Sequence, residues 1–137
     1  MERNPLVKKY ISQKATNEYC IENLIRNVII AEKYSRNKIV ITIDVIEINC
    51  DLIPYAVMGL SLALNDANIE QRGLCSASNI IRKNGEIVVD PTFEEEENSE
   101  FKLIWGCLYD LEENALYKQK GNSDEENLKK VILLIFN

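Results

Sequence analysis

The chain has 137 residues, 46% of them hydrophobic and none of them histidine, with a formal net charge of −6 at pH 7. This length is typical of one domain with a substantial core, and no apolar run approaches the roughly 18 residues needed to span a bilayer. The N-terminus has no apolar signal-peptide core, so we expect a soluble intracellular protein with no membrane contact. Without histidine, any chemistry would depend on carboxylates, lysines or a metal.

The four cysteines argue against a metal or disulfide framework. They lie at Cys20, Cys50, Cys75 and Cys107, without the paired spacing of zinc ligands. Disulfides are rare in chains that are not secreted, so we expect four reduced thiols that pack as small hydrophobic groups. No metal and no cofactor is expected.

The charge is unevenly distributed along the chain. Residues 1–40 hold eight Lys/Arg against four Asp/Glu, a balance of +4, whereas residues 41–137 hold eight against eighteen, a balance of −10. Most of the surface should therefore repel nucleic acid. The candidates for contact with a phosphate backbone are Arg3, Lys8, Lys9 and Lys14, although an ordinary solvated face explains these residues equally well.

The N-terminal part of the chain predicts an arm followed by a helix. Residues 1–15 show little apolar periodicity and are interpreted as an arm or the remnant of an upstream region. Thr16 or Asn17 then offers an N-cap, and the helix is expected to end near Tyr34. Its apolar face repeats at helical spacing through Ile21, Leu24, Ile25, Val28 and Ile29.

A strand and a second helix are predicted next. Residues 39–48 alternate apolar side chains in the manner of a strand. Asp51 is the expected N-cap of a helix that runs to about Asn68, with Pro54 tolerated in its first turn. This helix is apolar nearly all round and contains small residues such as Gly59, which predicts close packing between layers.

The C-terminal half predicts an antiparallel sheet. Asn84-Gly85 lies between residues 74–83 and 86–90 and is a strong hairpin signal. Residues 101–109 and 115–120 are two further predicted strands, and a capping box at Ser123 and Glu126 begins a last helix. The element order α-β-α-β-β-β-β-α predicts an α+β fold, with helices packed on a mixed, mostly antiparallel sheet.

One acidic cluster stands out as a candidate site. Five carboxylates gather just after the hairpin, at Asp90, Glu94, Glu95, Glu96 and Glu97. Such a group could hold Mg²⁺ or perform acid–base chemistry. A solvated acidic loop between two strands is the alternative, and charge runs of this kind are usually solvated.

Residues 39–69, with the hairpin and the following sequence Val88-Val89-Asp90-Pro91-Thr92-Phe93, resemble the second half of a ribonuclease PH-type domain. The resemblance covers about residues 17–135 and implies a ribonuclease PH-like fold for the single domain 1–137. That family has strands before the first helix. Residues 1–137 would then be a truncated domain, or another chain would supply the missing strands. An exposed sheet edge implies a partner, or self-association when isolated.

The resemblance also implies that the catalytic residues are altered. Active family members carry aspartates at positions that here hold Asp90, Thr92 and Glu96, so only the first is retained. Their phosphate-binding Gly-Gly-Thr-Arg corresponds to Cys50-Asp51-Leu52-Ile53. An apolar pair in place of Thr-Arg cannot bind phosphate bidentately, and Asp51 would repel it. We therefore do not expect an enzyme.

Three hypotheses follow. The first is a non-catalytic subunit of an RNA exosome core ring, which assembles with other ring subunits, contacts RNA through the assembly, and resides in the nucleus, nucleolus and cytoplasm. The second is an active phosphorolytic 3′–5′ exoribonuclease, and the third is an unrelated α+β interaction module. Arg36, in a stretch that resembles the family's entry to its long strand, is either an RNA or subunit contact or a surface loop residue.

Overall fold

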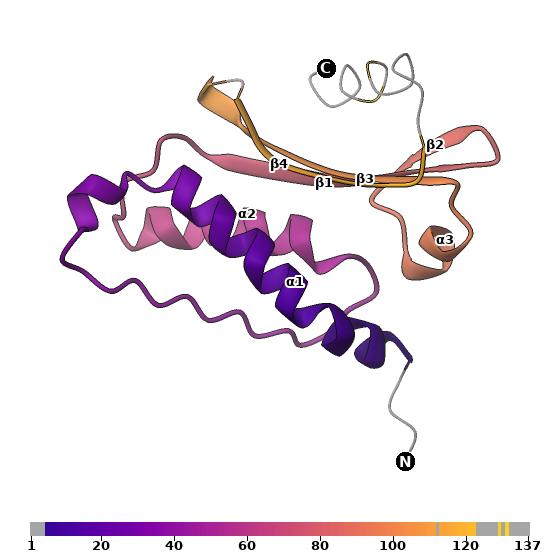
Figure 1. The fold of residues 1–137 in the computed structure, drawn as a ribbon, viewed down its shortest axis with the longest axis horizontal. Coiled ribbons are helices and arrows are strands. Elements are labelled where there is room, and N and C mark those ends of the chain that lie inside the picture. Colours follow the sequence, from indigo (N-terminus) through magenta and orange to yellow (C-terminus); the bar gives the residue numbers. More distant parts are fainter. Residues whose placement is uncertain (1–4, 112, 123–128, 130, 132–137) are drawn as a thin grey trace.

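The protein is built in layers, with an antiparallel sheet on one side and two long helices packed on one face of it (Figure 1). The computed structural model describes residues 5–111, 113–122, 129 and 131. Its elements are α1 (Pro5–Val28), η1 (Ala31–Tyr34), α2 (Leu52–Asp66), β1 (Cys75–Lys83), β2 (Glu86–Val89), α3 (Phe93–Glu97), β3 (Phe101–Leu108), η2 (Tyr109–Leu111) and β4 (Glu113–Lys120). None of the described helices is both long enough and apolar enough to span a membrane.

Helix α1 starts earlier than the sequence suggested. Proline is well tolerated in the first turn of a helix, and the helix begins at Pro5. The predicted N-cap at Thr16 or Asn17 is therefore wrong, and residues 5–15 are helical. Leu6, Val7, Tyr10 and Ile11 do stand at helical spacing, so the interpretation of residues 1–15 as an arm overlooked a pattern that the sequence contains. The expected apolar face is confirmed, since Leu24 and Val28 are almost fully buried.

The sheet has the order β2-β1-β3-β4, with every neighbouring pair antiparallel. The Asn84-Gly85 hairpin is confirmed, because both residues have positive φ, 52° and 80°, as a two-residue type I′ turn requires. Gly106 lies in β3, between Ala77 of β1 and Leu116 of β4. A Cβ at this position would stand 3.2 Å from the Cβ atom of each of these two residues. Glycine thus permits the close approach of three strands.

Side chains alternate between two cores. On the helix side, Ile104 and Leu108 of β3 join one cluster with Val57 of α2. On the opposite face, Leu103 and Trp105 join a second cluster. The last helix predicted from Ser123 onward lies largely outside the described residues; of its apolar stripe, Val131 is described and is buried in the second cluster.

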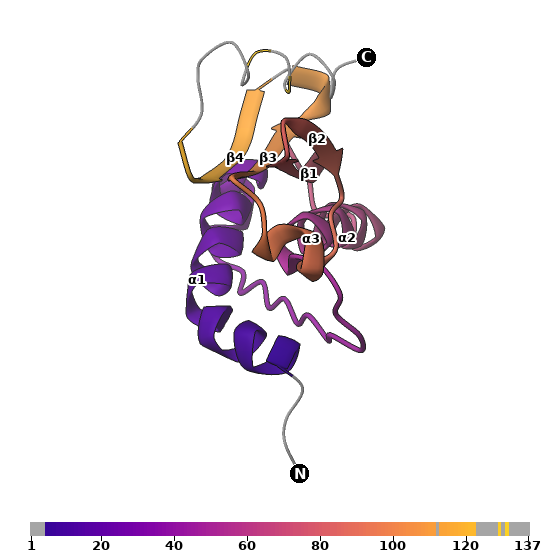
Figure 2. The same ribbon diagram turned by 90° about the vertical axis from the view of Figure 1, so that its right-hand side faces the viewer.

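Residues 39–48, here called the 39–48 segment, differ from the prediction of a strand. They form no strand and belong to no ladder among the described residues, and the backbone bends at Ile46. The segment runs along the side of α1 and α2 that faces away from the sheet (Figures 1 and 2). The predicted alternation of apolar side chains is confirmed for the first residues of the segment, since Ile39 and Ile41 pack against the core. A strand also needs neighbours to hydrogen-bond with, and apolar periodicity does not specify them.

The outer side of α2 is also more open than predicted. A Cβ added at Gly59 would meet no atom within 4 Å, and Tyr55 and Leu62 are 45% and 66% exposed. The expectation that Gly59 packs closely against another element is therefore wrong for this chain. The helix is apolar on two sides, and one of those sides remains uncovered.

Candidate functional site

The start of α2 carries an internal carboxylate. Asp51 has extended backbone dihedrals, and its Oδ1 accepts a hydrogen bond from the Ile53 backbone N–H at 3.0 Å. This confirms the predicted N-cap, with Pro54 in the first turn. Because the first N–H groups of a helix have no intrahelical acceptor, they attract anions. Here the chain's own carboxylate fills that position.

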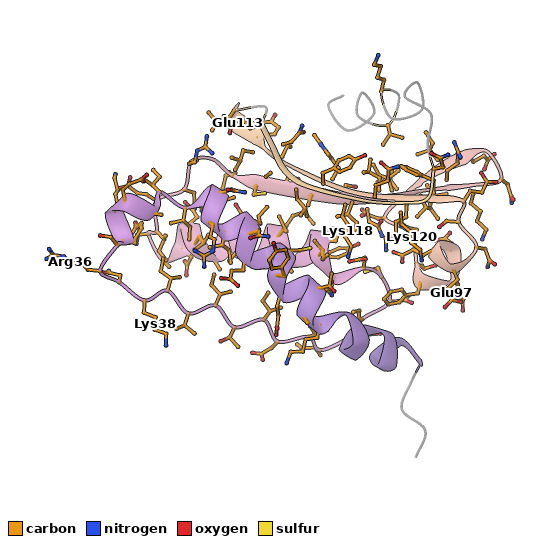
Figure 3. The ribbon with its side chains drawn as sticks, in the orientation of Figure 1. Arg36, Lys38, Glu97, Glu113, Lys118 and Lys120 are labelled. Atoms are coloured by element: carbon orange, nitrogen blue, oxygen red, sulfur yellow. The ribbon has the colours of Figure 1, made fainter. Side chains whose placement is uncertain are left out.

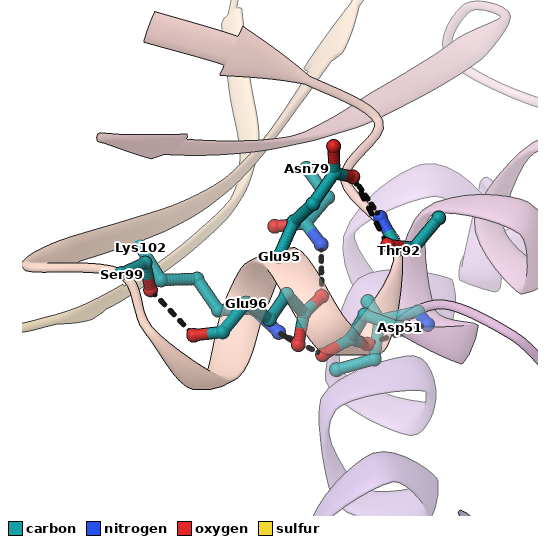
Figure 4. Close-up of polar contacts among 8 residues, drawn as sticks. Asp51, Asn79, Thr92, Glu95, Glu96, Ser99 and Lys102 are labelled. Carbon is teal, nitrogen blue, oxygen red and sulfur yellow. Dashed lines mark hydrogen bonds and ion pairs between the residues drawn. The ribbon is translucent and has the colours of Figure 1, made fainter. Parts of the chain in front are cut away.

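The second oxygen of Asp51 binds a lysine from the sheet. Lys102 of β3 donates from Nζ to Asp51 Oδ2 and to Glu96 Oε2, both at 2.7 Å. The three side chains are only 17%, 9% and 4% exposed, in the order Lys102, Asp51 and Glu96. Figure 4 shows the lysine between the two carboxylates. One cation therefore joins residues that lie 51 positions apart in the sequence.

Asn79 of β1 completes this cluster. Its Nδ2 donates to Glu96 Oε1 at 2.6 Å, so both oxygens of Glu96 are engaged. Asn79 Oδ1 is buried and has no hydrogen-bond partner. We call Asp51, Asn79, Glu96 and Lys102 the lysine cluster. Each of the three charged groups has a partner of opposite charge within the cluster.

The acidic residues after the hairpin do not act together. Asp90 is exposed with φ 54°, and its backbone N–H donates to the carbonyl of Asn79 at 2.8 Å. Thr92 is the N-cap of α3 and forms a capping box with Glu95. The hydrogen bonds that Glu95 accepts, first from the Thr92 backbone N–H and then from its hydroxyl, lower the pKa of Glu95. Of the cluster predicted from sequence, only Glu96 enters the lysine cluster.

The sequence therefore identified Asp51 and Glu96 as candidates but did not reveal their contact. Lys102 and Asn79 were missed, because each stands at an ordinary position in a strand pattern. One signal was present: Lys102 shares its strand face with the apolar residue Ile104, two positions along the chain. Of the other three phosphate-motif positions, Ile53 is fully buried in the core and Cys50 is half-buried. Leu52 packs against that same core.

Basic side chains lie at separate places on the described part of the chain. Arg36 and Lys38 project outward at the end of the molecule next to η1, whereas Lys118 and Lys120 lie on β4 near α3 (Figure 3). Lys14 is exposed on α1, 3.8 Å from Glu18. Arg3 lies outside the described residues. No three His, Cys, Asp or Glu side chains within the described part of the chain converge as metal ligands.

Two comparisons with known proteins find matches, one to a family model and one to a solved structure. Residues 8–70 match the family model described as 3′ exoribonuclease family, domain 1. Among solved structures, the chain is similar to the crystal structure of Rrp46 from rice (Oryza sativa), with 16% identity and a TM-score of 0.64. The match covers 96% of this chain and 60% of the rice chain. No curated protein matches the sequence.

These findings confirm the predicted resemblance, and the fold is ribonuclease PH-like. Together with the hairpin and the antiparallel sheet, they contradict the idea that the likeness to this family is coincidental. The chain spans three fifths of the length of the rice protein it matches.

Proposed function

We propose that the chain is a non-catalytic subunit of an RNA exosome core ring. It supports 3′–5′ RNA processing and degradation through assembly with other ring subunits and through the positioning of RNA. A nuclear, nucleolar and cytoplasmic location belongs to the same proposal. The support is the ribonuclease PH-like fold, together with the Asp51 carboxylate that occupies the helix start where active relatives bind phosphate.

The observation that carries the proposal is the engagement of Asp51. Phosphorolysis needs an inorganic phosphate at the start of this helix, and the Asp51 carboxylate already accepts the Ile53 N–H there. A phosphate ion would also meet like charge. Two unit charges about 4 Å apart repel by roughly 4 kcal/mol at the effective dielectric constant of a protein surface. Lys102 cannot offset this freely, because both Asp51 and Glu96 hold it.

The alternative is an active phosphorolytic exoribonuclease. One feature favours it: Glu96 lies beside the start of α2, so a carboxylate does stand near the position that phosphate would occupy. However, Glu96 is buried and ion-paired, and Asp90 is exposed. A catalytic Glu96 would first have to release Lys102.

An RNA degradation assay separates the two functions. Labelled single-stranded RNA is incubated with the full chain, inorganic phosphate and Mg²⁺, and nucleoside diphosphates are measured. We expect none. Phosphate-dependent release that is abolished by Glu96→Gln, but not by Asp66→Asn on the exposed surface of α2, would establish the enzyme instead.

A gain-of-binding variant tests the reasoning directly. Replacing Cys50 and Asp51 with glycine removes the carboxylate and leaves the backbone N–H groups at the helix start free to bind an anion, while buried Ile53 keeps its place in the core. We expect this variant to bind inorganic phosphate in calorimetry, whereas the unaltered chain does not. Assembly is tested separately, by co-purification of the tagged chain from its source cells and mass spectrometry for other ring subunits.

A further inference from the structure

The Asn84-Gly85 turn brings together the two groups that spontaneous deamidation of a protein requires. These groups are the side-chain amide of an asparagine and the backbone nitrogen of the next residue, which attacks it. Glycine hinders this attack least, because it has no side chain. Both residues are exposed at the tip of the β1–β2 hairpin, which projects at the end of the sheet (Figure 1).

Neither group is engaged elsewhere in the described part of the chain. There, the Gly85 N–H donates to no backbone carbonyl, and the Asn84 side chain takes part in no hydrogen bond or ion pair. A Cβ added at Gly85 would meet no atom within 4 Å. The space around the turn is therefore open to the water that the reaction consumes.

Asn68 provides a comparison within the same chain. It is exposed and also has a positive φ, 54° against 52° for Asn84. The residue after it, however, is the β-branched Ile69, whose backbone N–H donates to the carbonyl of Leu64 at 2.9 Å. The attacking nitrogen is therefore shielded and hydrogen-bonded after Asn68, whereas it is free after Asn84.

We propose that Asn84 is a deamidation site. The Gly85 nitrogen loses its proton to hydroxide and attacks Cγ of Asn84, so that a new C–N bond closes a succinimide ring. The bond from Cγ to Nδ2 then breaks, and Nδ2 takes a proton from water and leaves as ammonia. Water next opens the ring at either carbonyl, which gives aspartate or isoaspartate at position 84. The reaction needs neither a partner nor a catalytic site, so it is independent of the proposed assembly role.

The native turn slows this reaction. The first central residue of a type I′ turn has a ψ of about +30°. Ring closure requires the Asn84 Cβ and the Gly85 nitrogen to eclipse each other across the Cα–C bond, and this ψ holds them on nearly opposite sides of it. Asn84 therefore reacts when the hairpin tip opens. Strand β2 has four residues and a single neighbour, β1, in the described sheet, and short edges of this kind open at low free energy.

The two products affect the hairpin differently. Aspartate keeps the turn, because Asp-Gly suits a type I′ turn as Asn-Gly does. Isoaspartate adds a carbon atom to the main chain within a two-residue turn. The neighbouring pairs, Lys83 with Glu86 and Arg82 with Ile87, then lose the register that the turn fixes. We therefore expect β2 to loosen in the isoaspartate form alone.

The experiment follows the full chain during incubation at pH 8. Peptide mapping by mass spectrometry measures the gain of about 1 Da that accompanies exchange of the amide NH₂ for OH, and an isoaspartyl methyltransferase labels isoaspartate. We expect both signals at Asn84 and neither at Asn68 over the same time. The capped peptide Arg-Lys-Asn-Gly-Glu-Ile should react about tenfold faster than the chain, a factor that corresponds to about 1.4 kcal/mol for opening of the tip.

Two variants and one product test the role of the hairpin. Ile87→Ala removes a partly buried side chain next to the turn and should raise the rate at Asn84 severalfold, toward that of the peptide. Leu62→Ala, the same kind of truncation at an exposed site on α2, should leave the rate unchanged. Chain enriched in isoaspartate should exchange its β2 amide hydrogens faster than Asn84→Asp, which reproduces the other product.

Three results would overturn the proposal. The first is no mass gain at Asn84 after many half-lives of the peptide. The second is equal rates at Asn84 and Asn68, which would show that the free glycine nitrogen does not decide the site. The third is a chain that reacts as fast as the peptide, which would refute protection by the turn.

Discussion

Lys102→Met is the substitution that best tests the lysine cluster. It keeps most of the side-chain volume but leaves the Asp51 and Glu96 carboxylates buried without their shared cation. Lys102 Nζ lies 2.7 Å from an oxygen of each, and both carboxylate side chains are less than a tenth exposed. Removing one partner from a buried ion pair costs about 3–5 kcal/mol, because the remaining charge is uncompensated.

The assay is urea unfolding at pH 7, followed by circular dichroism. With a slope of about 2 kcal/mol per molar urea, the loss lowers the unfolding midpoint by roughly 2 M. Lys120→Met, a matched change at the β4 residue that pairs with Lys102 across the ladder, should cost less than about 0.5 kcal/mol as an ordinary surface substitution.

A triple variant separates charge from packing. Adding Asp51→Asn and Glu96→Gln to Lys102→Met removes all three charges, and asparagine remains a good N-cap. Replacement of a whole buried ion cluster is often nearly neutral, so most of the lost stability should return. If Lys102→Met alone costs less than about 1 kcal/mol, the cluster behaves as an exposed salt bridge and the reasoning about Asp51 is refuted.

Three further outcomes are expected. Gly59→Ala should stabilise the isolated chain by about 1 kcal/mol in thermal unfolding, because the site is open and alanine favours helix; destabilisation would show that the face is covered in solution. Gly121→Ala should destabilise it by about 1–3 kcal/mol, since φ is 90° and the new Cβ would lie 2.5 Å from the Glu100 carbonyl oxygen. Burial raises the pKa of the Cys75 thiol to about 11. At pH 8, iodoacetamide should therefore modify Cys75 at least tenfold more slowly than half-buried Cys20. Equal modification rates, measured by mass spectrometry, would contradict the burial of Cys75.

Several features of the fold could be predicted from the sequence because they depend on neighbours within a few residues. The Asn84-Gly85 turn needs only two residues that accept positive φ, and both have it. The Asp51 cap needs only a short carboxylate two positions before the N–H that it binds. The alternation of β3 likewise places Leu103 and Ile104 on opposite faces. The pattern of apolar residues thus fixed which side of each element is buried.

The rest was decided by parts of the chain that meet only after folding. Periodicity identifies an apolar side but not what covers it, so the 39–48 segment was expected to be a strand and Gly59 to be packed, although both lie at an open face. The contact between Lys102 and Asp51 spans 51 positions, and no local pattern encodes it. A charge enters a protein interior only where opposite charges and hydrogen bonds from several elements converge. The sequence alone therefore determined the local elements and their apolar sides, while the tertiary structure determined which carboxylates met and which surface stayed open.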